Sequence, residues 1–303
     1  MPTVRPDFAS PLLLSVLRCP TCATELFPAE GALACEADHR FEVVDGIPLL
    51  LDEETLAADP QYGQQRAYFD AEFAGYERYE LERWRIGYLD RLRSANTLGG
   101  AGRPLVDVGV GGSGYTVIEA AREGRPGIGC DLSLEGLRAA RRHAETEGVA
   151  DRTLFVCCSA EKLPLASGAF DVALAIAVLE HVPDDGAALA ELARVLAPGG
   201  RGWITVPHEL QSFSPLLWLP NVLHDRRLGH LRRYGARELV DQCRRRGLEP
   251  VDVQFTGHAV KLLQIALGPR LGDRFWWWCE WRDRARSQRR RGAQQLSAVL
   301  RRG

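Results

Sequence analysis

Cysteine and histidine residues near the N-terminus have the spacing of metal ligands. Cys19 and Cys22 are separated by two residues, Cys35 follows after twelve more, and His39 after a further three. Three thiolates and one imidazole complete a tetrahedral zinc shell, and the short gap lets a tight turn direct both sulfurs to one ion. A module of this size buries little apolar surface, so a metal would supply stability that its core lacks. We expect a structural zinc site; the alternative is a ribbon without metal, in which His39 is a polar loop residue.

A glycine-rich loop follows the apolar stretch at 104–109. This stretch contains Asp107 and leads into Gly109 and Gly111. Glycines at such a position let backbone N–H groups approach a ligand at a helix N-terminus, where the helix dipole favours anionic groups. Asp131 ends the next apolar stretch, where a carboxylate can accept hydrogen bonds from two ribose hydroxyls. These residues predict a cofactor site, and taken alone they still fit NAD.

The elements that position these residues alternate between strands and helices. Strands are expected at 104–109, 126–131, 153–157, 170–176 and 202–206, with later strands near 250–255 and 295–301. Helices are expected near 115–123, 133–147, 184–196 and 235–247. This alternation predicts an α/β fold with a doubly wound, Rossmann-like parallel sheet. Ligands in such sheets bind beyond the carboxyl ends of the strands.

The order of motifs between 155 and 207 resembles that of class I S-adenosylmethionine-dependent methyltransferases, of the type 11 kind. The matching motifs are Ser159 to Glu161 before Leu163-Pro164, Phe170-Asp171, Leu179 to Val182, and Arg194 to Gly200. Together with the glycine-rich loop, the resemblance covers about half of the chain. It implies that the cofactor is S-adenosylmethionine.

The resemblance also implies a role for each matching cofactor residue. Asp107 and Gly109 would face the methionine part, and Gly111 would lie under the cofactor. Asp131 would bind the ribose hydroxyls, and Leu132 would pack on adenine. The other implied contacts are Ser159, Ala160 and Glu161 beside the adenine ring, and Ala177 on the path to the methyl group. Ser159 replaces the Asp that is usual in the family, so the hydrogen bond to the adenine amine is weaker or lost.

Residues 17–51 resemble the N-terminal zinc ribbon of bacterial 23S rRNA guanine-N1 methyltransferases, which share the Cys-x2-Cys and Cys-x3-His arrangement. They are also similar to small zinc-ribbon activator proteins of tRNA and protein methyltransferases, in which a segment like Val44 to Pro48 closes the module. We therefore expect a zinc-ribbon-like module at 1–51, a linker and helical lid at 52–100, and a cofactor-binding domain at 101–303 with acceptor-site insertions at 207–234 and 257–292.

Aromatic residues at helical spacing fill the segment 61–93, Tyr68, Phe69 and Phe73 among them. Such a stripe usually packs a helix onto a domain. The sharper hypothesis is a lid in which Tyr68 and Phe69 cover the bound cofactor.

Methyl transfer asks little of a protein beyond alignment, because the sulfonium is already activated; a base is needed only where the acceptor must lose a proton. His181 is the first candidate for that base, and the alternative is that it forms a local hydrogen bond and shapes the pocket wall. His208, His230 and Tyr234 are further candidates, the last two because they resemble a His-x3-Tyr segment that helps close the pocket in small-molecule methyltransferases. His258 is expected at the surface or in a loop.

Four tryptophans stand in the second insertion before a run of arginines: Trp276, Trp277, Trp278 and Trp281. One interpretation is that a C-terminal helical hairpin packs on the body or forms a homodimer contact. A hydrophobic acceptor pocket is the second. The third is a patch that contacts a membrane surface, because Trp beside Arg anchors interfacial helices.

Charge is unevenly distributed along the chain, although the net charge is only −2. Residues 1–225 contain 19 basic and 33 acidic side chains, whereas 226–303 contain 19 basic and 7 acidic. The ribbon segment is itself acidic, and a platform for RNA phosphates needs the opposite sign. The leading hypothesis is a methyltransferase acting on a small molecule, such as a natural-product, sugar or lipid intermediate.

The alternative function is an rRNA or tRNA base methyltransferase of the guanine-N1 type, which the ribbon and the basic tail favour. A third hypothesis is a partner subunit that has kept the fold and lost the cofactor, but Asp107, Gly109, Gly111 and Asp131 all stand in place. No stretch is apolar and long enough to span a membrane, and the N-terminus has no secretory pattern, so we expect a cytoplasmic protein.

Overall fold

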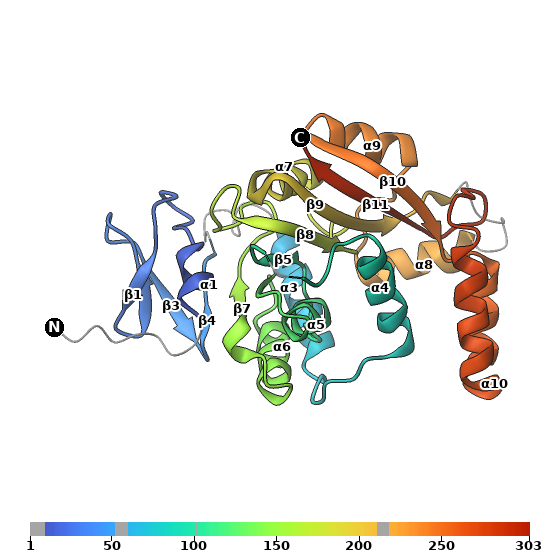
Figure 1. Ribbon diagram of the computed structural model, residues 1–303, viewed down its shortest axis with the longest axis horizontal. Coiled ribbons are helices and arrows are strands. Elements are labelled where there is room, and N and C mark those ends of the chain that lie inside the picture. Colours follow the sequence, from blue (N-terminus) through green and yellow to red (C-terminus); the bar gives the residue numbers. More distant parts are fainter. Residues whose placement is uncertain (1–9, 52–59, 101, 211–217) are drawn as a thin grey trace.

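The computed structural model describes residues 10–51, 60–100, 102–210 and 218–303. Its N-terminal part is a small module that begins with α1 (Pro11–Ser15), where Pro11 follows the N-cap residue Ser10. An antiparallel sheet comes next, in the order β1 (Phe27–Ala29), β2 (Ala32–Ala34), β3 (Arg40–Val44) and β4 (Ile47–Pro48). Figure 1 shows this module beside one end of a much larger sheet.

The larger sheet has seven strands in the order β10-β11-β9-β8-β5-β6-β7. Their bounds are β5 (Leu105–Val108), β6 (Gly127–Asp131), β7 (Thr153–Cys157), β8 (Phe170–Ile176), β9 (Leu196–Pro207), β10 (Leu248–Thr256) and β11 (Gln295–Arg302). β11 runs antiparallel to both of its neighbours, and the five strands from β9 to β7 are parallel. The chain order reverses between β5 and β8, which is the switch point where open sheets of this kind bind ligands.

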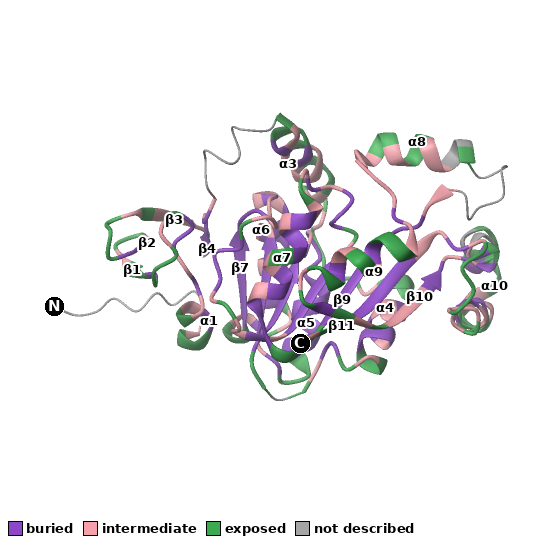
Figure 2. Ribbon diagram, turned by 90° about the horizontal axis from the view of Figure 1, so that it is seen from above, coloured by how far each residue is buried: buried purple, intermediate pink, exposed green. Residues whose placement is uncertain are grey.

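Helices connect the strands and cover both faces of this sheet. Their bounds are α3 (Pro60–Phe73), α4 (Arg83–Ser94), α5 (Tyr115–Arg122), α6 (Leu134–Thr146), α7 (Asp185–Val195), α8 (Trp218–Leu228), α9 (Ala236–Arg244) and α10 (Ala259–Arg284). The strands β5 to β8 are buried almost throughout, whereas β10, α8 and α10 carry many half-buried or exposed residues (Figure 2). The expected α/β, Rossmann-like fold is confirmed.

Alternation along the strands divides the apolar core into two layers. In β7, Leu154 and Val156 belong to the cluster that includes leucines of α7 and α9, whereas Phe155 belongs to the cluster under α4 and α5. Successive side chains of a strand point to opposite faces, so a run of apolar residues requires helices on both sides. This packing holds the strand ends rigidly in place.

The small module is joined to the large sheet at β7. Leu49 forms a parallel bridge with Cys157, and the N–H of Leu50 donates to the carbonyl of Cys157 at 2.9 Å. Leu17 forms a second, antiparallel bridge with Leu165. The module therefore lies against the outer edge of β7 and is joined to it by isolated bridges.

The second insertion forms a hairpin. The backbone of Gly272 is left-handed (φ 75°), and α10 folds back there, so that the side-chain amide of Gln264 donates to the carbonyl of Trp276 at 2.9 Å. Trp277, Trp278 and Trp281 are exposed on this hairpin. None of the described helices is long and apolar enough to cross a membrane.

His258 lies in a loop, which is one of the two positions expected for it, but it is not at the surface. It is buried at the start of α10, where its Nδ1 lies 2.9 Å from Asp283 and its Nε2 lies 2.8 Å from the carbonyl of Arg289. The ring ties both ends of the hairpin together, and a partner more than twenty residues away leaves no local sequence signal.

Candidate cofactor and acceptor site

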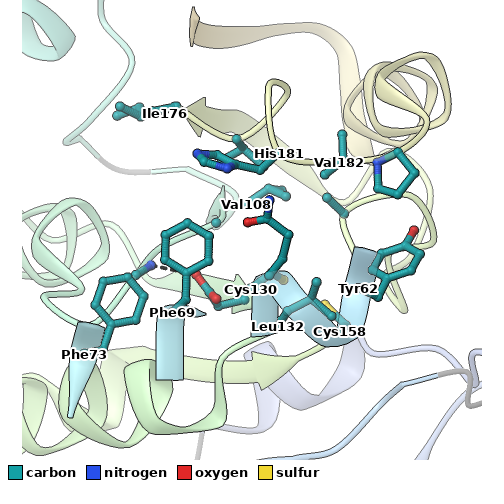
Figure 3. A pocket seen from close by; sticks show the side chains of 18 residues that line it. Tyr62, Phe69, Phe73, Val108, Cys130, Leu132, Cys158, Ile176, His181 and Val182 are labelled. Atoms are coloured by element: carbon teal, nitrogen blue, oxygen red, sulfur yellow. Dashed lines mark hydrogen bonds between the residues drawn. The ribbon is translucent and has the colours of Figure 1, made fainter. Parts of the chain in front are cut away.

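A cavity lies at the switch point, beyond the carboxyl ends of β5, β6 and β8. Its empty space is about 910 Å³, including the part open to solvent. α3 covers it from one side, and Figure 3 shows Phe69 and Phe73 of this helix facing strand-end residues across the cavity. The lining residues are Tyr62, Gln65, Phe69, Phe73, Val108, Gly109, Gly111, Cys130, Asp131, Leu132, Cys158, Ala160, Ile176, Ala177, Val178, His181, Val182 and Pro183.

The glycine-rich loop leaves no room for larger residues at this site. Gly109 and Gly111 both have left-handed backbones, with φ of 72° and 63°. A Cβ on Gly109 would overlap the Cγ2 methyl of Val178, and one on Gly111 would stand 3.3 Å from the ring of Phe73. Only glycine allows the backbone to lie this close to the cavity.

Asp131 is held at the end of β6 by the neighbouring backbone. Its Oδ2 accepts from the N–H of Gly111 and its Oδ1 from the N–H of Ser133, both at 2.9 Å. Burial raises the pKa of this carboxyl, and these backbone donors oppose the rise. The carboxylate lines the cavity and retains lone pairs for hydroxyl donors.

Asp107 lies beneath the loop, behind the cavity wall. It is buried and accepts a hydrogen bond from the hydroxyl of Thr116 on α5. Burial raises its pKa to about 7. Gly109, two residues later, forms the wall instead.

One face of α3 forms the cover. Tyr62, Gln65, Phe69 and Phe73 follow each other at intervals of three and four residues, as expected for one side of a helix. Tyr68 is outside this face, and its ring meets that of Phe69 edge-on at 5.2 Å. The helical lid was predicted, but Tyr62 and Gln65 were missed, although their spacing to Phe69 carried the signal.

Two polar contacts fasten this helix. Asp70 accepts from the Ser133 hydroxyl at 2.6 Å, next to Asp131. Gln65 donates to the carbonyl of Gly229 at 2.8 Å. These hydrogen bonds join α3 both to the loop after β6 and to the first insertion.

Of the residues expected beside adenine, some line the cavity and others lie behind its wall. Leu132 and Ala160 line the cavity. The Ser159 hydroxyl accepts from the N–H of Glu161 at 3.2 Å, and Glu161 accepts from the N–H of Asp184 at 2.5 Å. These two side chains shape the turn behind the wall.

Ala177 lines the cavity just beyond β8 in an unusual conformation. Its φ is 57°, which costs energy for any residue with a Cβ. Its N–H donates to the carbonyl of Thr205 at 2.9 Å, which helps to hold this backbone. Strained backbone of this kind is concentrated at functional sites.

His181 is the cavity-lining histidine among the described residues. Its ring lies between that of Phe69, at 5.2 Å, and that of His230, at 4.8 Å. Burial, and next the neighbouring His230, lower the pKa of His181 to about 3. Burial raises the pKa of the adjacent Glu180 to about 8.

The other expected catalytic residues lie behind the wall. His208 is buried, with its Nδ1 3.0 Å from the carbonyl of Tyr234. The hydroxyl of Tyr234 donates to the carbonyl of Leu179 at 3.0 Å and is 2.8 Å from Asp185. Tyr234 thus joins the strand-end loop to the first insertion, and the structure brings only His230 close to His181.

The four expected metal ligands lie together in the small module. Single ligand atoms of Cys19, Cys22, Cys35 and His39 all lie within 4.8 Å of one another. The sulfurs of Cys22 and Cys35 are 3.6 Å apart, and the sulfurs of Cys19 and Cys35 lie 3.5 and 3.4 Å from Nδ1 of His39.

Comparison with known proteins places this site in a family. The family model described as a methyltransferase domain matches residues 106–204. A ubiquinone biosynthesis O-methyltransferase of Ralstonia nicotianae is 32% identical over 176 residues, which are 55% of this chain and 70% of that protein. One of Psychrobacter arcticus is 38% identical over 122 residues, 39% of this chain and 47% of that protein. The chain spans about half the length of the first curated relatives that it matches.

Solved structures share the fold. The geranyl diphosphate C-methyltransferase of Streptomyces coelicolor A3(2) superposes with a TM-score of 0.58 at 18% identity, over 81% of this chain and 99% of that one. The chain belongs to the S-adenosylmethionine-dependent methyltransferases. The resemblance drawn from the motif order is confirmed for the methyltransferase domain; for the zinc ribbon it stays a prediction.

Proposed function

We propose that this protein transfers the methyl group of S-adenosylmethionine to an oxygen atom of a small-molecule acceptor. The observation that carries the proposal is the cover: α3 lies over the switch-point cavity, with Phe69 and Phe73 lining it opposite the strand-end residues. The ubiquinone biosynthesis O-methyltransferases among the relatives support oxygen as the acceptor atom. We further propose the division of the chain into a ribbon-like module, a linker with lid, and a cofactor-binding domain.

The cavity fits the cofactor. Asp131 offers a fixed carboxylate for ribose hydroxyls, Leu132 and Ala160 offer apolar walls for a flat ring, and the glycine backbone at Gly109 and Gly111 offers close approach. When bound, S-adenosylmethionine supplies an electrophilic methyl carbon on a positively charged sulfur.

The protein's contribution is to align the acceptor and exclude water. Phe69 and Phe73 cover the site, and the strained loop at Ala177 places a rigid wall opposite them. When bound, the cofactor would give its methyl group to the acceptor oxygen as the carbon–sulfur bond breaks with its electron pair on sulfur, and the hydroxyl proton would pass to bulk water at the open side of the cavity. His181 has too low a pKa to hold that proton near pH 7, so we assign it to contacting the acceptor. Alignment of this kind accounts for large rate enhancements without a strong base.

The test combines binding and transfer. Calorimetric titration of the full chain with S-adenosylhomocysteine should show tight binding that Asp131→Ala weakens by roughly 10- to 100-fold, because charge-assisted hydrogen bonds are lost. Asp151→Ala, at an exposed site, is the matched control and should bind as the wild type does. Labelled S-adenosylmethionine should then pass its methyl group to members of a panel of phenols and other hydroxy compounds. Transfer to ribosomal or transfer RNA alone would replace this proposal by the RNA alternative.

We also propose that Cys19, Cys22, Cys35 and His39 bind a structural zinc ion. The four ligand atoms are already gathered, with sulfur separations close to those around a tetrahedral ion. A closed shell of four protein ligands gives this ion a role in stability and none in methyl transfer.

A further inference from the structure

A second cavity lies on the face of the large sheet that α4 covers. Its empty space is about 750 Å³, including the part open to solvent, and the described residues that line it are all different from those of the cofactor cavity. Residues of β9, β10 and β11 form its floor, and α4 and the segment at the end of α10 form its walls. Three arginines line it, Arg91 from α4, Arg201 from β9 and Arg284 from α10, together with one acidic residue, Asp252.

Two of these arginines have more donors than their neighbours use. Arg91 is only 7% exposed, and its Nη2 donates to Glu280 at 2.8 Å and to Asp283 at 3.4 Å. Nη2 of Arg284 donates to the carbonyl of Gly87 at 3.0 Å. Among the described residues, the buried Nε atoms of these two arginines have no hydrogen-bond partner. Because buried polar atoms are nearly always satisfied in folded proteins, these donors favour a bound group with acceptor oxygens.

The third arginine stands opposite a fourth. Arg201 in β9 pairs in register with Arg301 in β11, and directly opposed residues of an antiparallel pair share one face, where like charges destabilise the pairing. Glu249, which is opposite Arg301 on its other side, is held by Arg244 at 2.9 Å. Within the described part of the chain, Arg201 has no acidic partner and donates only from Nη1 to the carbonyl of Ala95 at 3.1 Å. A bound anion would offset this repulsion.

The acidic residues around the cavity already have partners. Asp252 accepts from the side-chain amides of Gln254 and Gln288, at 2.8 and 3.3 Å. Outside the lining, Arg91 and Arg284 share their acidic neighbours with other side chains. These pairs are Glu280 with Lys261, Asp283 with His258, and Asp90 with Arg93. The described lining itself therefore has three positive charges and one negative charge.

We propose that this cavity binds a small molecule through a phosphate group. The guanidinium group of arginine is a planar fork of donors that matches the oxygens of phosphate and carboxylate. A phosphate has three terminal oxygens and up to two negative charges, so it can engage three guanidinium groups at once, whereas a carboxylate has two oxygens and one charge. The ligand would connect α4 to the sheet and to the end of α10. This site is separate from the one proposed for methyl transfer.

Calorimetric titration of the full chain with inorganic phosphate tests this site, in a phosphate-free buffer at physiological ionic strength. We expect saturable binding of one phosphate per chain. Arg201→Gln and Arg284→Gln should each weaken it roughly 10-fold or more, because a charge-assisted hydrogen bond is lost. Asp252→Asn should instead strengthen it, since this change removes the negative charge that faces the ligand.

Glycerol 3-phosphate, titrated in the same way, distinguishes two sources of the phosphate group. Tighter binding than that of inorganic phosphate identifies a phosphate ester as the ligand, and equal or weaker binding identifies free phosphate. S-adenosylhomocysteine should leave the binding of either probe unchanged, because the two cavities share none of their described lining residues.

Arg245→Gln is the matched control. Arg245 is exposed at the end of α9 and does not line the cavity, so this variant should bind phosphate as the wild type does. Circular dichroism shows that each variant is folded. The proposal is overturned if the wild type shows no saturable binding, if Arg201→Gln binds phosphate equally well, or if Arg245→Gln weakens binding to the same extent. Displacement of phosphate by S-adenosylhomocysteine would place the phosphate in the cofactor cavity and would also contradict the proposal.

Discussion

Gly109 packs directly beneath the side chain of Val178, so that the loop after β5 and the loop after β8 touch at the cavity wall. Gly109→Ala should weaken both folding and cofactor binding, because the new methyl group overlaps Val178 and the backbone is left-handed. We expect a loss of about 2 to 4 kcal/mol in the free energy of unfolding, measured by urea denaturation.

A second glycine separates the effect of the overlap with Val178 from the effect of the left-handed backbone. Gly124 is also left-handed but has open space around its Cβ position, so Gly124→Ala should cost only about 1 kcal/mol. Adding Val178→Ala to Gly109→Ala should restore part of the lost stability. Equal effects of the two alanine variants would show that the contact with Val178 is unimportant.

The buried carboxyl of Asp107 predicts a pH dependence of stability. Its pKa is about 7 in the folded protein and near 4 when the chain is unfolded, so the folded state binds the extra proton between these values. The free energy of unfolding should therefore fall as pH rises from 4 to 7. Asp107→Asn should remove this contribution and be more stable than wild type at pH 8, by at most about 4 kcal/mol.

Denaturant unfolding at several pH values measures this difference. Asp151→Asn, at an exposed position, should keep the wild-type slope. If Asp107→Asn also keeps that slope, the carboxyl is charged throughout this range and the reasoning from burial is wrong.

The cover on the cavity can be tested with neighbouring aromatic residues. Phe69 lines the cavity and Tyr68 does not, although their rings touch. Phe69→Ala should lower kcat/KM for methyl transfer by roughly tenfold or more, since alignment and water exclusion are lost. Tyr68→Ala should change it much less, and the reverse order would mean that the helix closes with a different face.

Metal in the small module should stabilise the neighbouring strand. Cys22→Ser with Cys35→Ser should lower the zinc content by one ion per chain. Because the N–H of Leu50 bonds to Cys157, its hydrogen exchange should then become faster, while amides in β11, at the opposite side of the sheet, keep their protection. Unchanged zinc content would show that the ion is bound elsewhere.

Strand positions were predictable because each strand ends in a recognisable local pattern. Asp131 and Gly111 lie beyond the ends of strands as expected, since both stand within a few residues of an apolar run that becomes a buried strand. β9 begins earlier than expected, at Leu196, because Leu196 pairs with Phe170 at the start of β8; the pairing resumes at Arg201 after a shift in register. Such pairing depends on a strand more than twenty residues away.

Long-range contacts explain what could not be predicted at the site. The side chain of Gln65 is held at the cavity by a hydrogen bond to the carbonyl of Gly229, which is far away in the sequence. His230 lies beside His181, whereas His208 lies behind the cavity wall. This difference depends on how one insertion folds over the sheet. No pattern within either segment records that arrangement.

The bridge between Leu49 and Cys157 has a consequence for solubility. β7 is the last strand of the seven-stranded sheet, and an uncovered outer strand offers unpaired N–H and C=O groups to any other chain. The segment around Leu49 and Leu50 pairs with part of the free edge of β7, so these backbone groups are already bonded within the chain. The module thus shields the sheet against strand-to-strand aggregation, and this benefit is independent of methyl transfer.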